Sequence, residues 1–262
     1  MLSFVLLRTL AYRTKASMHT APPSIALTVF MPAFNESANL PHTVPALIAA
    51  LHNQVRCAPT FELIIVNDGS SDDTGQIADQ LAAHDPHIRV IHQPVNRGIG
   101  LGFVAAMTAA LGEWFILIPA DLAMQLEELP KYFEAVRDDE ADIVVGHRSD
   151  RADYSPLRRL ISVINIGLIR LLFKMEQQQF NYISLYRSQC LRQMTLRYTD
   201  SALFYAEILV YARAQGYKLV NVWINYVPRE HGLQTGSNWR LVVKTVRDIM
   251  AFWLRWTFKG AG

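Results

Sequence analysis

Short apolar runs alternate with stretches of helical periodicity over the first 150 residues of the chain. The runs are rich in β-branched and aromatic residues, as strands are. This pattern predicts strands over residues 25–30, 61–66, 88–92, 114–118 and 143–145, and helices over 36–52, 73–83, 98–111 and 126–136. Such alternation is typical of an α/β fold, a doubly wound and mostly parallel sheet with helices on both faces.

The pattern changes after residue 150. It predicts a helix over 157–174, a strand over 182–186, a helix over 203–215, a strand over 219–226 and a last helix over 240–258. Charged residues of the last helix share one narrow stripe, and most other positions are apolar or aromatic. That pattern indicates either a helix in a membrane interface or a terminal helix packed on the core. Trp253, Trp256 and Phe258 favour the membrane.

Length and composition favour one large domain, because 262 residues with 51% hydrophobic content can bury a sizeable core. We expect an N-terminal tail over 1–24, one domain over 25–239 and a C-terminal amphipathic helix over 240–262. No run of 18 apolar residues is free of charge, which argues against a membrane-spanning helix. In residues 1–24 the basic residues follow the apolar run, the wrong order for a secretory signal.

The net charge is only +2, but the positive charges are clustered. Residues 151–174 hold five Arg or Lys against one Asp, and residues 229–262 hold six against two acids. These excesses indicate either an anionic partner, a phosphate-bearing ligand or a membrane surface, or ordinary solvated helix faces. We expect no nucleic acid partner. Cys57 and Cys190 form no CxxC pair, so neither a disulfide scaffold nor a zinc site is expected.

Polar turns follow the first two predicted strands, at the sheet edge where α/β proteins bind ligands. In NDGSSDDT, Ser71 or Asp72 is placed to cap the next helix, which leaves Asp68 to accept hydrogen bonds from a nucleobase or a ribose. In MPAFNES, Glu36 suits ribose hydroxyls and Phe34 suits a base. Local turn structure alone would also explain most of these residues.

The segment RGIGLG is similar to a dinucleotide-binding fingerprint, but Phe103 stands at the third glycine position. This residue argues against a Rossmann oxidoreductase. A glycine-rich helix start preceded by Arg97 can still contact phosphate oxygens through backbone N–H groups.

The turns PAFNES, IIVNDGSSDDT, NRGIGLG, PADLAMQLEEL and VVGHR occur in an order that resembles glycosyltransferase family 2. Within that family, the likeness is to polyprenyl-phosphate sugar synthases, and it covers about residues 25–240. The resemblance implies a GT-A fold and inverting transfer of a sugar from a nucleotide diphosphate sugar, UDP- or GDP-hexose, to a polyprenyl phosphate. It further implies a peripheral position on the cytoplasmic face of a membrane, alone or beside an integral-membrane partner.

The same resemblance implies roles for individual residues. It assigns the nucleoside to Pro32, Phe34, Glu36, Val66 and Asp68. The glycine-rich helix start adds Arg97 and Gly98 to the expected nucleotide site. The resemblance places Ala120 and Asp121 beside the diphosphate, and Arg148 and Arg229 on phosphates of donor or acceptor. Guanidinium groups suit that role because they bind phosphate oxygens bidentately.

Asp121 stands alone where the family has Asp-x-Asp followed two residues later by Gln, because Pro119 and Ala123 occupy the other two positions. One carboxylate is enough for Mg2+ or Mn2+ when a substrate diphosphate and water supply the remaining ligands. Two alternatives stay open. One is a non-catalytic protein that binds nucleotide sugars, and the other is metal-free catalysis by Arg97, Arg148, Arg229 and His231.

The acceptor decides whether a base is needed. A lipid phosphate is already an anion near neutral pH, whereas a saccharide or other hydroxyl acceptor would require a carboxylate base. Glu207 matches an acidic position of the family and is the candidate for that base. The alternative is a structural carboxylate that pairs with an arginine.

Overall fold

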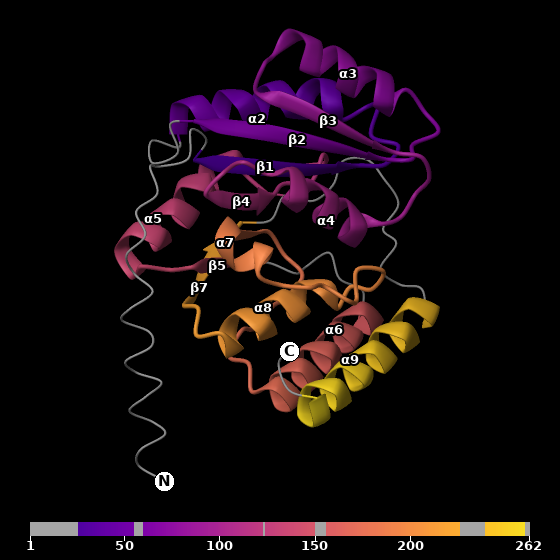
Figure 1. The fold of residues 1–262 in the computed structure, drawn as a ribbon, viewed down its shortest axis with the longest axis vertical. Coiled ribbons are helices and arrows are strands. Elements are labelled where there is room, and N and C mark those ends of the chain that lie inside the picture. The colour runs from indigo at the N-terminus through magenta and orange to yellow at the C-terminus, as the bar shows by residue number, and fades with distance from the viewer. Residues whose placement is uncertain (1–25, 55–59, 123, 150–155, 226–238, 260–262) are drawn as a thin grey trace.

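The computed structural model describes residues 26–54, 60–122, 124–149, 156–225 and 239–259 (Figure 1). A single sheet of seven strands runs through this part of the chain in the order β3-β2-β1-β4-β6-β5-β7. The strands are β1 (Leu27–Ala33), β2 (Phe61–Asp68), β3 (Ile88–Gln93), β4 (Trp114–Leu117), β5 (Ile143–Arg148), β6 (Ser184–Arg187) and β7 (Leu219–Ile224).

Strand β6 is the one that runs against the others in the described sheet. It pairs antiparallel with β4 on one side and with β5 on the other, whereas the remaining neighbours pair in parallel. Because β6 reverses the direction twice, β4 and β5 still point the same way. The carboxyl ends of β1, β2, β4 and β5 therefore lie along one edge of the sheet.

Helices cover both faces of the sheet, as the pattern predicts. Helices α2 (Leu40–Gln54), α3 (Thr74–His84) and α5 (Leu129–Asp139) pack on one face, after a short 3-10 helix η1 (Leu126–Glu128) that precedes α5. The other face is covered by α4 (Ile99–Ala109), α6 (Pro156–Phe173), α7 (Ser188–Arg192), α8 (Phe204–Ala214) and α9 (Trp239–Lys259).

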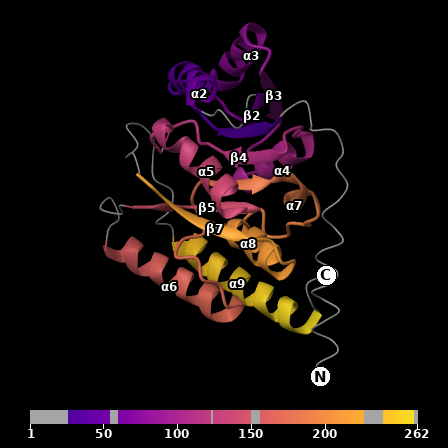
Figure 2. The same ribbon diagram turned by 90° about the vertical axis from the view of Figure 1, so that its left-hand side faces the viewer.

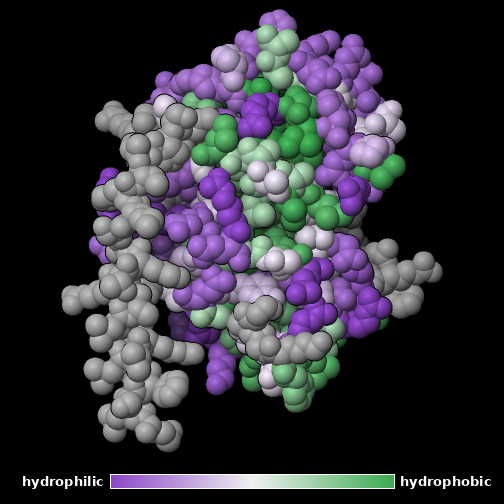
Figure 3. Space-filling model, viewed as in Figure 1, coloured by the Kyte–Doolittle hydropathy of each residue, from purple (hydrophilic) through white to green (hydrophobic). Residues whose placement is uncertain are grey.

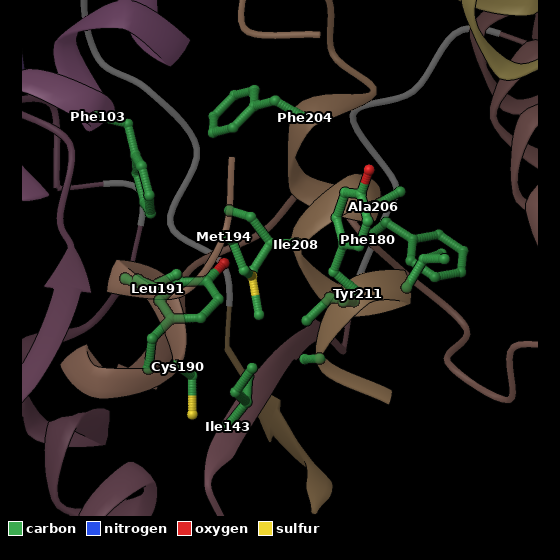
Figure 4. Packing of buried hydrophobic residues seen from close by; sticks show 14 of the residues in the cluster. Phe103, Ile143, Phe180, Cys190, Leu191, Met194, Phe204, Ala206, Ile208 and Tyr211 are labelled. Carbon is green, nitrogen blue, oxygen red and sulfur yellow. The ribbon is translucent and has the colours of Figure 1, made fainter. Parts of the chain in front are cut away.

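Successive residues of the central strands pack alternately into two separate hydrophobic cores. In β2, Leu63 and Ile65 join the core under α2 and α3, while Ile64 and Val66 join the core under α4 and α8. Figure 4 shows the second core, in which aromatic rings of α4 and α8 face the apolar residues around α7. Burial on both faces explains why these strands read as continuous apolar runs.

Two helices start differently from the pattern. The helix predicted from residue 36 begins at Leu40, because Asn35 adopts a left-handed backbone (φ 56°) and the next residues form a turn. The helix predicted over 126–136 divides into η1 and α5, with Pro130 in the first turn of α5. Helix α7 was not predicted, because its five residues are too few to show a periodic pattern.

The predicted C-terminal helix is confirmed as α9, which packs against α6. Figures 1 and 2 show this pair at the end of the molecule opposite α3. Within the described residues, none of the helices combines the length and the apolar content needed to cross a bilayer. The predicted tail over 1–24 lies outside the described residues.

Candidate active site

Asp68, the last residue of β2, joins two loops of the candidate site. Its carboxylate accepts the backbone N–H groups of Arg97 at 2.7 Å and of Gly98 at 2.8 Å. Gly98 has a φ of +84°, which favours glycine, and directly precedes α4. The sequence suggested that N–H groups at this helix start contact a phosphate. Those of Arg97 and Gly98 instead donate to Asp68. The nucleoside contact of Asp68 stays a prediction.

The loop after β1 is fastened to the turn after β2. The N–H of Asn35 donates to Ser70 Oγ at 3.0 Å, and the N–H of Ser71 donates to Asn35 Oδ1 at 3.0 Å. The N–H of Glu36 donates to Thr74 Oγ1 at 2.7 Å. Because its backbone is held this way, Phe34 presents a ring that is 45% exposed at the sheet edge. An exposed ring here suits stacking on a planar base.

Asp72, one of the two residues that the sequence pattern suggests as a cap, stands one residue before the N-cap position of α3 and accepts hydrogen bonds at the start of that helix. Its carboxylate accepts the N–H and the hydroxyl of Thr74, at the start of α3, and the N–H of Ser37. Burial opposes ionisation, but hydrogen bonds from Ser37 and Thr74 outweigh it and lower the pKa of Asp72 from 3.8 to about 2. The carboxylate is therefore ionised at neutral pH.

Two residues assigned to the nucleoside belong to β1 and β2 themselves. Pro32 and Val66 are paired in the register of these strands. Val66 is 1% exposed, and its side chain lies in the core near Gly102. The side chain of Val66 is therefore not available to a nucleoside. Its backbone can still form the floor of a nucleoside site.

Asp121 lies in a tight turn after β4. The N–H of Leu122 donates to the carbonyl of Pro119 at 3.1 Å, and Leu122 has a φ of +43°. A left-handed backbone at a non-glycine residue costs about 1 kcal/mol or more. The turn is anchored from α2, because Thr43 Oγ1 donates to the carbonyl of Ala120 at 2.7 Å.

Metal binding at Asp121 can be judged from the groups around it. In the described ranges, no three His, Cys, Asp or Glu side chains gather in a way that could hold a metal ion. A single hard carboxylate oxygen fits Mg2+ or Mn2+ only when other oxygens complete the coordination shell. The residues present therefore fit a cation that arrives with a diphosphate, and they do not form a complete site alone.

Arg148 ends β5, with only 8% of its surface exposed. The amide of Gln179 fixes its backbone, since Arg148 N–H donates to Oε1 at 3.1 Å and Nε2 donates to Arg148 O at 2.9 Å. Gln179 was not predicted. It stands in a run of three glutamines, 177–179, and that run alone does not indicate a contact with β5.

Glu207 is 0% exposed in α8. Its carboxylate accepts the backbone N–H groups of Arg197 at 3.0 Å and of Tyr198 at 3.1 Å. Burial raises its pKa, although these hydrogen bonds oppose the rise. Of the two alternatives, the structure favours the structural role: backbone N–H groups supply these hydrogen bonds, and the charges of Arg197 and Arg255 also oppose the rise in pKa. Arg229 and His231 lie outside the described residues.

The chain and its fold are similar to known proteins. A family model described as glycosyl transferase family 2 matches residues 28–201, and the chain belongs to that family. It is 30% identical over 213 residues to glycosyltransferase AglD of Haloferax volcanii, a match that covers 78% of this chain and 34% of AglD. The chain thus spans about a third of the length of that relative.

Two further comparisons cover more of both chains. The polyprenol monophosphomannose synthase of Mycolicibacterium smegmatis is 28% identical over 255 residues, which cover 92% of this chain and 90% of the synthase. Glucosyl-3-phosphoglycerate synthase of Mycobacterium tuberculosis, solved with Mn2+, UDP and glucosyl-3-phosphoglycerate, superposes with a TM-score of 0.64. It is 18% identical, covering 87% of this chain and 81% of that one. This likeness confirms the predicted fold.

Proposed function

We propose that this glycosyltransferase moves a hexose, with inversion, from a UDP- or GDP-hexose to a polyprenyl phosphate. One observation carries the proposal. The turns with Phe34, Asp68, Asp121 and Arg148 lie at the carboxyl ends of four strands that share one sheet edge. The acceptor class is supported by relatives such as the mycobacterial synthase, whose name states that it makes polyprenol monophosphomannose.

In this proposal the loops after β1 and β2 hold the nucleoside. Phe34 stacks on the base, while Glu36 and Asp68 accept hydrogen bonds from base and ribose. Arg148 and, from the sequence, Arg229 bind phosphate oxygens of donor or acceptor. The donor's bond between the anomeric carbon and the diphosphate breaks as an acceptor phosphate oxygen attacks from the opposite face. No proton has to leave that oxygen, so the burial of Glu207 is compatible with the reaction.

A divalent cation, Mg2+ or Mn2+, is part of the proposal. Asp121 would hold it together with the donor diphosphate, and it would neutralise the charge of the departing nucleotide diphosphate. The support is the oxygen donor of Asp121 and the strained turn that presents it. Metal-free neutralisation by arginines is the alternative.

We propose further that α6 and α9 rest on the cytoplasmic face of a membrane. Of thirteen large apolar side chains exposed in the described residues, eight lie on these two helices: Leu160, Val163, Ile164, Leu171, Val243, Met250, Leu254 and Phe258. Figure 3 shows apolar surface at this end of the molecule. On α6 the four residues follow helical spacing and form one stripe. An integral-membrane partner is not required by this geometry.

The charges of the two helices fit an anionic lipid surface. Helix α6 contains no acidic residue, and the one acid of α9, Asp248, is 7% exposed and bonded to Lys244 at 3.1 Å. Arg159 and Arg170 are exposed on α6, as is Arg247 on α9. Apolar stripes flanked by cations bind anionic interfaces through both burial and charge.

A transfer assay tests the reaction. The purified chain is incubated with labelled UDP- or GDP-hexose, undecaprenyl phosphate and Mn2+, with undecaprenol as the hydroxyl control. We expect labelled lipid phosphate sugar with one donor base, and at least a hundredfold less product for Asp121→Asn. Product with the hydroxyl acceptor would favour the second reaction type. Donor binding without turnover of either acceptor would favour a binding-only protein.

Flotation with vesicles tests the membrane surface. We expect binding to vesicles that contain phosphatidylglycerol and much weaker binding to pure phosphatidylcholine. Leu171→Ser removes an exposed leucine of α6 and should weaken flotation severalfold. Leu111→Ser, a similar change at an exposed leucine near the end of α4, is the matched control. Equal flotation of both variants would contradict a docking surface on α6 and α9.

A further inference from the structure

Three segments of the candidate site, called arms below, meet at Asn225. They are the chain from the Asp121 turn to η1, the end of β5 at Arg148 and Ser149, and the end of β7, which Asn225 follows. Its backbone N–H donates to Glu128 Oε2 at 3.2 Å, and its side-chain Nδ2 donates to Glu128 Oε1 at 2.9 Å. Its Oδ1 accepts from Ser149 Oγ at 3.0 Å. Every polar group of the Asn225 side chain is thus used for contacts between segments far apart in sequence.

Each contact leads to a different arm. Glu128 ends η1, which continues the chain from the Asp121 turn. Ser149 follows Arg148, and its N–H also donates to the carbonyl of Ile224 at 3.0 Å. Asn225 itself is the residue from which the chain continues beyond β7. The cluster of Glu128, Ser149 and Asn225 therefore ties the Asp121 segment to the Arg148 end of β5.

The carboxylate at the centre of this cluster is well supported. Glu128 is 7% exposed, and it also accepts from Lys131 Nζ at 2.8 Å. Burial raises its pKa, but the hydrogen bonds from Lys131 and Asn225 outweigh burial and hold the pKa below its ordinary value. A buried, ionised carboxylate with bidentate contacts restricts its partners more than a neutral contact would.

We propose that Glu128 and Asn225 are positioning residues that hold the Asp121 turn and Arg148 at the separation a donor diphosphate requires. They contact no substrate. Their effect is on affinity, because a diphosphate has to be met from two arms at once. The proposal rests on the proposed function only in taking the diphosphate as the ligand of these arms.

Nucleotide affinity, measured by calorimetry with UDP or GDP and Mn2+, tests the proposal without any acceptor. Asn225→Asp sets a second carboxylate against Glu128, and Glu128→Gln removes the charge. Each single variant should weaken affinity about tenfold and raise the KM for donor with a smaller change in kcat. The double variant again pairs a donor with an acceptor, since the amide introduced at position 128 can donate to the carboxylate introduced at position 225. It should recover most of the affinity.

The matched control is Glu127→Gln, an exposed glutamate next to Glu128 with the same loss of charge. Its affinity should equal that of the wild type. If Glu128→Gln folds poorly, Asn225→Asp still tests the role of the cluster, because Asn225 is exposed and its substitution should leave the fold intact. Unchanged affinity in both folded single variants, or no recovery in the double variant, would overturn the proposal. A wild type that binds nucleotide but transfers nothing would instead overturn the proposed reaction.

Discussion

The hydroxyl of Thr43 donates a hydrogen bond of 2.7 Å to the carbonyl of Ala120, across a sequence separation of 77 residues. Thr43 is buried in α2, and Ala120 directly precedes Asp121. The bond therefore fixes the turn that carries the proposed metal ligand from outside the turn itself.

Replacing Thr43 by valine keeps the shape and removes this bond. We expect Mn2+-dependent nucleotide affinity to fall about fivefold, because a lost hydrogen bond is worth about 1 kcal/mol. Titration calorimetry with Mn2+ measures the change. Thr108→Val is the control, since the Thr108 hydroxyl donates to Val104 O within α4. An equal loss in both variants would show that the Ala120 contact has no special role.

Glu207→Gln should lower the stability of the fold more than it lowers nucleotide affinity or turnover. Glu207 Oε2 accepts both backbone N–H groups and the amide oxygen can replace it, but the NH2 group then faces the Arg197 N–H, which also lies 3.1 Å from Oε1. A buried donor left without an acceptor costs about 1–3 kcal/mol. We expect a lower melting temperature and nucleotide affinity within about twofold of the wild type. A hundredfold loss of turnover at unchanged melting temperature would instead restore Glu207 as the base.

The pH dependence of Glu207 has a defined sign. Burial raises its folded pKa above the ordinary value of 4.5. Its contribution to the free energy of unfolding is therefore complete below that value and is lost as pH rises through the folded pKa. Wild-type protein should lose stability relative to Glu207→Gln as pH rises above about 4.5, measured by urea unfolding at a series of pH values. A constant difference would contradict the shift.

Asp72 should act in the opposite direction. Its folded pKa of about 2 lies below the ordinary 3.8. Its contribution is present above the ordinary value and is lost as pH falls toward 2. Asp72→Asn keeps a good cap residue but removes this dependence, so its stability should decline less between pH 5 and pH 2. Asp73→Asn, an exposed neighbour that makes no side-chain cap bond, is the comparison in the same unfolding series.

Two glycines of α4 should respond differently to alanine. A Cβ at Gly100 would lie 2.1 Å from the carbonyl oxygen of Thr199, whereas one at Gly102 would lie 3.5 Å from the ring of Phe30. We expect Gly100→Ala to destabilise by about 1–3 kcal/mol. Gly102→Ala should be neutral or stabilise by up to about 1 kcal/mol. Thermal unfolding compares the two, and equal stability would contradict the close packing at Gly100.

These glycines also show which features of the fold and the site can be predicted from the sequence. The order of turns and apolar runs was enough to predict the sheet and the edge that holds Asp68, Asp121 and Arg148, because strand ends depend on local patterns. The spacing of glycines suggested a phosphate loop, yet Gly100 permits contact with Thr199 and the Gly98 amide donates to Asp68. Those contacts join segments far apart in the chain and leave no periodic signal.

Other parts of the site were out of reach for the same reason. Glu128 and Asn225 are 97 residues apart, and Gln179 meets Arg148 across 31 residues. Each is an ordinary polar residue in sequence. The direction of β6 was also not evident, because the residue pattern of a four-residue strand does not distinguish a parallel from an antiparallel neighbour.

The antiparallel β6 has a consequence for how the chain is made. It completes the sheet between β4 and β5, but it is synthesised about 70 residues after β4. At 5–20 residues per second, the ribosome needs roughly 4–14 s to deliver it. During that interval the nascent sheet ends in an unpaired, wholly apolar β4 edge. We therefore expect newly made chains to be prone to aggregation, and to need chaperones, while this edge is unpaired.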